Sequence, residues 1–169
     1  MIRQIRIRNV CAAAVASVFM LAFAVSASSA TYESLAGLKS VKAIFDVRAA
    51  SAKSAALQLK LIHDTYQDKN IRAVSKKPSF VVAFMGPSVK LISTNRQAFP
   101  AEDQKSLDEI AQTIREMAKE GIRIQVCDLA VKANGIDPAS ILPEIKHVPN
   151  SWISLIGYQA KGYSIVPVY

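Results

Sequence analysis

The sequence predicts an α/β fold: a three-layer α/β/α sandwich around a mainly parallel sheet of about five strands. Strand-like apolar segments alternate with amphipathic helical segments, which is the pattern of parallel strands joined by crossover helices. Residues 79–85 (SFVVAFM) form a nearly continuous apolar run, as expected of a central parallel strand. Residues 100–120 carry the clearest helical periodicity in the chain. These three observations together favour strands covered by helices on both faces.

The first thirty residues have the composition of a cleavable export signal. The positive charges at its start come from Arg3, Arg6 and Arg8. An apolar run at 10–25 follows, and small-x-small sites then end at Ala27 and at Ala30. The run is shorter than the roughly 20 residues that a spanning helix needs. We expect a signal peptide at 1–30, one domain at 31–169 and a periplasmic location, with an uncleaved anchor as the alternative.

The charge balance limits the classes of partner. Loss of the three arginines and of no acid lowers the formal net charge from +8 to +5. A moderately basic, exported domain argues against a nucleic-acid partner. Its scattered lysines indicate a solvated surface with weak attraction to anionic membranes, without stable membrane insertion after signal cleavage.

The first half of the domain begins with a short linker and then a strand at 41–47, whose apolar residues alternate. Residues 51–69 form an amphipathic helix, because apolar side chains recur three and four positions apart. The central strand at 79–85 comes next and ends at Gly86. Residues 87–92 fit either a short helix or an irregular turn.

The second half begins with a polar loop at 94–99 and the helix at 100–120, which has a proline and two acids in its first turn. A third strand at 122–126 leads to Cys127, and a short helix then runs to the Asn134-Gly135 pair. A helical turn fits the segment 138–145.

The last elements are a helix and an edge strand. Asn150 is the expected cap of a helix at 151–162. The final strand, 163–168, contains Pro167, which places it at an edge of the sheet.

Cys127 is the only thiol of the predicted mature domain, because Cys11 lies in the signal segment. An odd cysteine in an exported protein forms an intermolecular bond, is reactive, or is buried and inert. Ligand sites of open α/β sheets lie at the carboxyl ends of the strands, where Cys127 is expected together with Arg48 and the turn at Gly86. The N-terminus of the following helix favours a thiolate there, whereas Asp128 opposes it.

The remaining polar candidates are weaker. His147, in the loop-like segment 146–149, is a candidate to approach this edge, whereas His63 fits a structural histidine beside an apolar helix face. Asp46 fits a turn or cap residue, and Trp152 fits packing or a subunit interface. Two separated histidines and one cysteine lack metal-ligand spacing, and no phosphate-binding glycine loop is present, so we expect no metal and no cofactor.

Two segments resemble the DsrE/DsrF-like family of sulfur metabolism, including its YchN-type members. They are GIRIQVCDLAVKANGI at 121–136 and VPNSWISLIGYQAKGYSIVPV at 148–168. The resemblance implies a three-layer fold that assembles into homo- or hetero-oligomers, commonly trimers or hexamers. It also implies that Cys127 accepts sulfane sulfur as a persulfide and passes it to a partner thiol.

The sequence therefore predicts a periplasmic DsrE-like protein that acts as a sulfur carrier or sulfurtransferase, with Cys127 as the catalytic residue. Arg48, Asp128 and His147 are the supporting candidates. The expected partners are further copies of the chain and a sulfur-donor or sulfur-acceptor protein or a small sulfane-sulfur compound. Two alternatives stay open: a non-catalytic oligomeric binding or assembly module with Cys127 packed in the core, or a thiol redox sensor.

Overall fold

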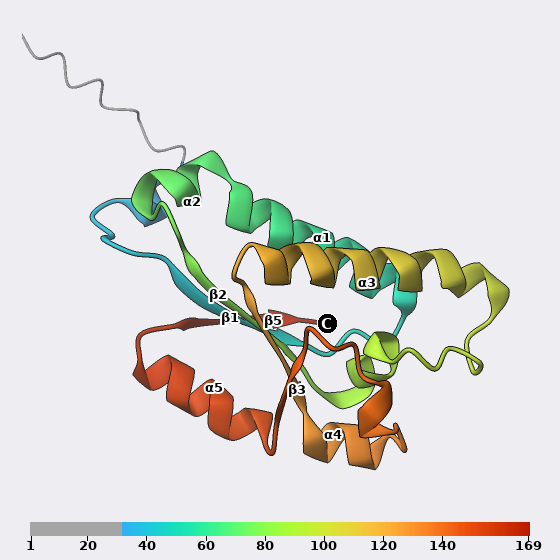
Figure 1. Cartoon of the computed structure of the whole chain (residues 1–169). Helices are drawn as coiled ribbons and strands as arrows, with labels where there is room; N and C mark the ends of the chain where they lie inside the picture. The colour runs from blue at the N-terminus through green and yellow to red at the C-terminus, as the bar shows by residue number, and fades with distance from the viewer. Residues whose placement is uncertain (1–31) are drawn as a thin grey trace, which may run out of the picture.

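Five parallel strands form one sheet in the order β4-β3-β2-β1-β5 (Figure 1). The computed structural model describes residues 32–169, so the predicted signal peptide at 1–30 lies outside the described residues. The strands are β1 Lys42–Val47, β2 Ser79–Phe84, β3 Arg123–Cys127, β4 Lys146–Val148 and β5 Ser164–Val168. The predicted parallel sheet of about five strands is confirmed, and β5 with Pro167 lies at an edge as expected.

Helices cover both faces of this sheet, which confirms the three-layer sandwich (Figure 1). One face carries α1 Ala52–Gln67, α2 Lys69–Val74 and α3 Gln104–Lys119, and the other carries α4 Asp128–Ala133 and α5 Ser151–Ala160. Short 3₁₀ helices are η1 Glu33–Leu35, η2 Gly86–Ile92, η3 Ala101–Asp103 and η4 Pro138–Ser140. None of the helices within 32–169 combines the length and apolar character needed to cross a bilayer.

The two faces of the sheet are packed unequally. Side chains alternate along β1, so that Phe45 and Val47 join the large cluster beneath α1 and α3, whereas Ile44 joins a second cluster on the opposite face. That second cluster has six buried members: Ile44, Val81, Ala83, Met85, Cys127 and Leu155. The main hydrophobic stabilisation therefore lies between the sheet and α1 and α3, and the thinner layer contains Cys127.

The predicted helix at 51–69 is divided in the structure. Asp68 leaves the helical conformation with φ −57° and ψ 135°, and its carboxylate accepts hydrogen bonds from the backbone N–H groups of Asn70 and Ile71. That side chain begins α2, which the sequence analysis did not predict. The acid at position 68 works as a helix cap because its oxygen satisfies otherwise unpaired N–H groups.

The segment predicted to be loop-like, 146–149, contains strand β4. It pairs with β3 through Gln125–Lys146, Val126–His147 and Cys127–Val148. β4 has only three residues and no buried one, so no apolar alternation marks it in the sequence. Its existence depends on tertiary pairing.

Two further segments are settled by the structure. Residues 86–92 form the 3₁₀ helix η2, which resolves the choice between a short helix and an irregular turn. The helical turn expected at 138–145 covers only Pro138–Ser140, and Ile141 instead forms an isolated antiparallel bridge with Ser93.

Two leucines of α1 test how much the core between α1 and the sheet contributes to stability. Leu59 is 0% exposed in the large cluster, whereas Leu57 is 59% exposed on the same helix. We expect Leu59→Ala to lower the free energy of unfolding by about 2–5 kcal/mol, because it leaves a cavity that the core fills incompletely. We expect Leu57→Ala to change it by less than about 0.5 kcal/mol. Urea denaturation of the two variants measures the difference, and equal destabilisation would contradict this packing.

Candidate functional site

Cys127 lies where β3 ends and α4 begins, as the sequence analysis predicted. It is the last residue of β3 and the N-cap residue of α4, with extended backbone angles of φ −81° and ψ 114°. Its sulfur accepts a hydrogen bond from the backbone N–H of Ser151 at 3.4 Å. Ser151 is the first residue of α5, so the sulfur also lies at the N-terminus of a ten-residue helix. The unpaired N–H groups and the helix dipole there favour negative charge on the sulfur.

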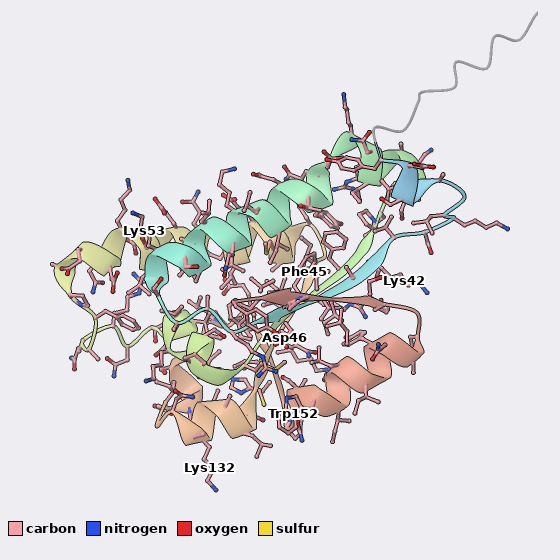
Figure 2. The ribbon with its side chains drawn as sticks, turned by 180° about the vertical axis from the view of Figure 1, so that it is seen from behind. Lys42, Phe45, Asp46, Lys53, Lys132 and Trp152 are labelled. Carbon is pink, nitrogen blue, oxygen red and sulfur yellow. The ribbon has the colours of Figure 1, made fainter. Side chains whose placement is uncertain are left out.

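Cys127 lines a small pocket although it is only 6% exposed. The pocket has a volume of about 260 Å³ and is mostly apolar. It is lined by Arg48, Met85, Gly86, Cys127, Leu129, Ala130, Asn150 and Trp152. Trp152 is 63% exposed at the point where the start of α5 meets α4 (Figure 2). The pocket therefore opens between the two helices of the thinner layer.

Arg48 is the one charged residue that lines the pocket. Its Nε donates to both carboxylate oxygens of Asp46 at 3.0 Å, and its Nη2 lies 3.2 Å from the sulfur of Met85. Asp46 is 6% exposed, on the same face of β1 as Ile44. The buried carboxylate therefore holds the guanidinium at the pocket and offsets part of its charge.

Asp46 has a more specific role than the turn or cap role that the sequence analysis gave it. Because Asp46 and Arg48 are two positions apart at the end of a strand, their side chains lie on one face of the sheet. This spacing was the one sequence signal that could have indicated the pair. A buried acid two residues before an exposed arginine is, however, common at strand ends and does not by itself mark a site.

Hydrogen bonds between separate loops hold the pocket in shape. The hydroxyl of Ser88 is fully buried and lies 2.8 Å from the carbonyl oxygen of Val47 and 3.0 Å from that of Met85, which joins the ends of β1 and β2. The side-chain amide of Asn134 donates to the carbonyl of Gly86 at 3.2 Å, which joins α4 to η2. Gly86 has φ +61°, a conformation that residues with a Cβ rarely adopt.

The two other supporting candidates do not line the pocket. Nδ1 of His147 lies 2.6 Å from a carboxylate oxygen of Asp128, and both side chains are partly exposed. His147 pairs with Val126 in the sheet, so the pleat directs its side chain to the face opposite that of Cys127. The structure thus brings Arg48 to Cys127 and pairs Asp128 with His147 beside the site.

His63 lies elsewhere, on the α1 and α3 side of the sheet. Its Nε2 is 3.1 Å from a carboxylate oxygen of Glu120, and its Nδ1 is 3.9 Å from one of Glu116. It borders a surface depression of about 990 Å³ between α1 and α3. That depression is wide and no thiol lines it, so size alone does not make it the candidate site. Within 32–169, no three His, Cys, Asp or Glu side chains group as metal ligands would.

Comparisons with known proteins agree with this architecture. A model of the DsrE/DsrF-like family matches residues 41–168. An uncharacterized protein of Aquifex aeolicus (strain VF5) is 28% identical over 130 residues, which are 75% of this chain and 56% of that protein. The chain therefore spans little more than half the length of this relative.

Solved structures share the fold at low sequence identity. A protein of unknown function from Methanobacterium thermoautotrophicum superposes with a TM-score of 0.57 at 13% identity. The YchN protein of E. coli gives 0.55 at 12% identity, and each match covers 75% of this chain and 98% of the other. A conserved protein of unknown function from Bacteroides thetaiotaomicron gives 0.51 at 18% identity, with 75% and 95% covered.

The hydrogen bond between Ser151 and Cys127 can be removed selectively. Proline is well accepted at the first position of a helix, and Asn150 before it already has the extended conformation that proline requires. Ser151→Pro deletes the N–H donor, whereas Ser151→Ala keeps it and serves as the control. We expect alkylation of Cys127 by iodoacetamide at neutral pH to be about fivefold slower in Ser151→Pro than in Ser151→Ala, the factor for a hydrogen bond of about 1 kcal/mol. Equal rates, with both variants folded, would show that this N–H does not stabilise the thiolate.

Proposed function

The chain belongs to the DsrE/DsrF-like family, and from this premise we propose that it carries sulfane sulfur on Cys127. One observation carries the proposal: Cys127 lines a pocket at the carboxyl edge of the sheet together with Arg48, and its sulfur accepts a hydrogen bond from the N–H of Ser151. Activated thiols need these surroundings, namely partial access and nearby positive charge.

The proposed reaction needs no cofactor. The Cys127 thiolate attacks the outer sulfur of a persulfide or thiosulfonate donor, and the sulfur–sulfur bond of the donor breaks. The electron pair of that bond leaves with the donor as a thiolate or sulfinate, and Cys127 becomes a persulfide. An acceptor thiolate then attacks the terminal sulfur and releases the Cys127 thiolate unchanged. No net oxidant or reductant is consumed, because the sulfane sulfur atom moves at constant oxidation state.

Donor and acceptor both belong to other molecules in this proposal. Cys127 is the free cysteine of the described residues, and residues 31–169 contain no second thiol. Within the pocket, the Ser151 N–H stabilises negative charge on the sulfur and Arg48 attracts the anionic end of a donor. The apolar walls at Leu129 and Trp152 exclude water from the reacting sulfur.

A structural role for Cys127 is the second candidate function class, and its burial favours it. The residue packs with Met85 and Leu155 in the small cluster. In that case the domain is a non-catalytic binding or assembly module. A redox sensor, in which Cys127 forms a mixed disulfide with a small thiol, is the third candidate.

Intact mass spectrometry separates these candidates. We expect incubation with a sulfane donor to add the mass of one sulfur atom to the protein, and we expect Cys127→Ser to abolish this adduct. Leu57→Cys combined with Cys127→Ser presents a single accessible thiol on the exposed face of α1 and controls for non-specific persulfidation.

Two other outcomes would contradict sulfur transfer. If the folded protein shows neither a sulfur adduct nor iodoacetamide labelling, both sulfur transfer and redox sensing by Cys127 are ruled out. A mixed disulfide with glutathione and no persulfide would support the sensor instead.

We also propose that the chain is exported to the periplasm, on the basis of the charged start and apolar run at 1–30. The same mass measurement reports this, because cleavage after Ala27 or Ala30 removes a defined mass. Recovery of uncleaved protein from the cytoplasmic fraction would contradict export.

The thinner layer also supports self-association. α5 exposes Trp152, Ile153 and Ile156 at 63–68%, and Leu129 of α4, which lines the pocket with Trp152, is 57% exposed. Large apolar side chains exposed on one helix face are typical of a protein interface. The proposed occupant is a second copy of this chain, whose own α5 presents the same apolar face, so that the two patches are self-complementary.

Sedimentation of a charge variant tests this assembly. We expect the parent protein to be oligomeric at micromolar concentration and Ile156→Asp to weaken association at least tenfold, because it buries an unpaired charge. Leu57→Asp is the matched control, since Leu57 is 59% exposed on α1 and should leave the assembly intact. A monomeric parent protein would rule out this interface.

A further inference from the structure

The edge of the sheet at which the strands begin is strongly basic. We define this basic edge as residues 32–42, 68–79, 120–123 and 161–164, which lead into β1, β2, β3 and β5 or form α2. It contains eight basic side chains: Lys39, Lys42, Lys69, Arg72, Lys76, Lys77, Arg123 and Lys161. Seven of the eight are exposed, and Arg72 is half-buried. Its acids are Glu33, Asp68 and Glu120.

The whole net charge of the described domain lies at this edge. Without Arg3, Arg6 and Arg8, the 21 basic residues of the chain become 18, against 13 acidic ones. With eight basic and three acidic residues assigned to the basic edge, ten of each remain elsewhere. The rest of the domain therefore has zero formal net charge. The positive charge is concentrated at the edge where the strands begin.

Contacts show that these residues form one patch. Nζ of Lys42 donates to the carbonyl of Lys161 at 3.4 Å and lies 5.8 Å from the ring centre of Tyr163. Arg123 hydrogen-bonds the hydroxyl of Tyr163 and donates to that of Ser79 at 3.0 Å. Side chains from the starts of three strands thus meet around one tyrosine.

Two further observations indicate a positive potential there. Burial raises the pKa of Tyr163, but its hydrogen bonds with Ser79 and Arg123 and the charges of Arg123 and Lys42 outweigh it and hold the pKa below the usual 10.0. Two of the acids are engaged within the fold: Asp68 caps α2, and Glu120 contacts His63 and Arg72. Neither carboxylate pairs with the exposed lysines.

The chain enters the domain at the same edge. Tyr32, the first residue that the structure describes, belongs to this edge. Tyr32 and Leu38, both in this edge, are 53% and 49% exposed. Apolar and aromatic side chains among lysines are the composition of surfaces that rest on anionic bilayers.

We propose that the basic edge binds the anionic headgroups of a phospholipid bilayer. Parallel strands place the Cys127 pocket at the opposite edge, roughly 15–20 Å away for strands of five or six residues. Binding in this orientation leaves the pocket facing solution, where a soluble donor or acceptor can reach it. The proposal is independent of the chemistry at Cys127, because no residue is shared between the two sites.

Vesicle sedimentation of the full chain tests the proposal with charge-matched variants. The edge variant carries Lys42→Gln, Lys77→Gln and Lys161→Gln. The control variant carries Lys53→Gln, Lys90→Gln and Lys132→Gln, three exposed lysines that follow the carboxyl ends of β1, β2 and β3. Figure 2 shows Lys42 at one end of the molecule, with Lys53 and Lys132 toward the other. Because all proteins share residues 1–31, differences between them report the folded domain.

On vesicles of equimolar phosphatidylglycerol and phosphatidylcholine at low salt, we expect the edge variant to partition about tenfold to a hundredfold more weakly than the control variant. The difference should vanish at high salt and on phosphatidylcholine alone. Equal loss in both variants would overturn the proposal, because net charge rather than this edge would then set binding. Retention of vesicle binding by the edge variant, with loss of binding to an acidic protein such as a polyglutamate-tagged probe, would assign the edge to a protein partner instead.

Discussion

All five strands run in the same direction, and this one constraint separates the molecule into two unlike edges. Backbone hydrogen bonds between β1, β2 and β3 bring three strand ends together, so that Arg48, Met85 and Cys127 meet although they are far apart in the chain. The same pairing gathers the strand starts, where Lys42 and Arg123 meet around Tyr163. In an antiparallel sheet, starts and ends would alternate and neither cluster would form.

The unequal packing of the two faces explains why a pocket at Cys127 can open in the thinner layer. α1 and α3 bury a large cluster against one face, and this packing supplies most of the stability of the domain. The opposite face has six buried residues and a helix whose outer side chains are exposed. A layer of this kind leaves room for a pocket at Cys127 and an apolar surface at its mouth. The main core and the candidate site therefore lie on different faces of one sheet.

The electrostatics of the pocket depend on a buried acid rather than on the thiol's own neighbour in sequence. Asp128 follows Cys127 directly, but it pairs with His147 beside the pocket. Asp46 lies beneath the pocket and holds Arg48 by both carboxylate oxygens. The guanidinium at the pocket is thus oriented before any ligand binds, and such orientation lowers the entropic cost of recognition.

The sequence by itself determined the layer architecture, most helices and strands, and the position of Cys127 between β3 and α4. Periodicity is a local property, and it reports which residues face a core wherever burial is strong, as in 79–85 and 100–120. Tertiary structure alone decided that residues 146–148, none of them buried, form β4, since their strand conformation comes from pairing with β3. It also decided that Asp46 holds Arg48 and that Ser151 donates to Cys127, 24 positions away. Those contacts join segments whose distance depends on strand order, and strand order is set by the packing of the whole domain.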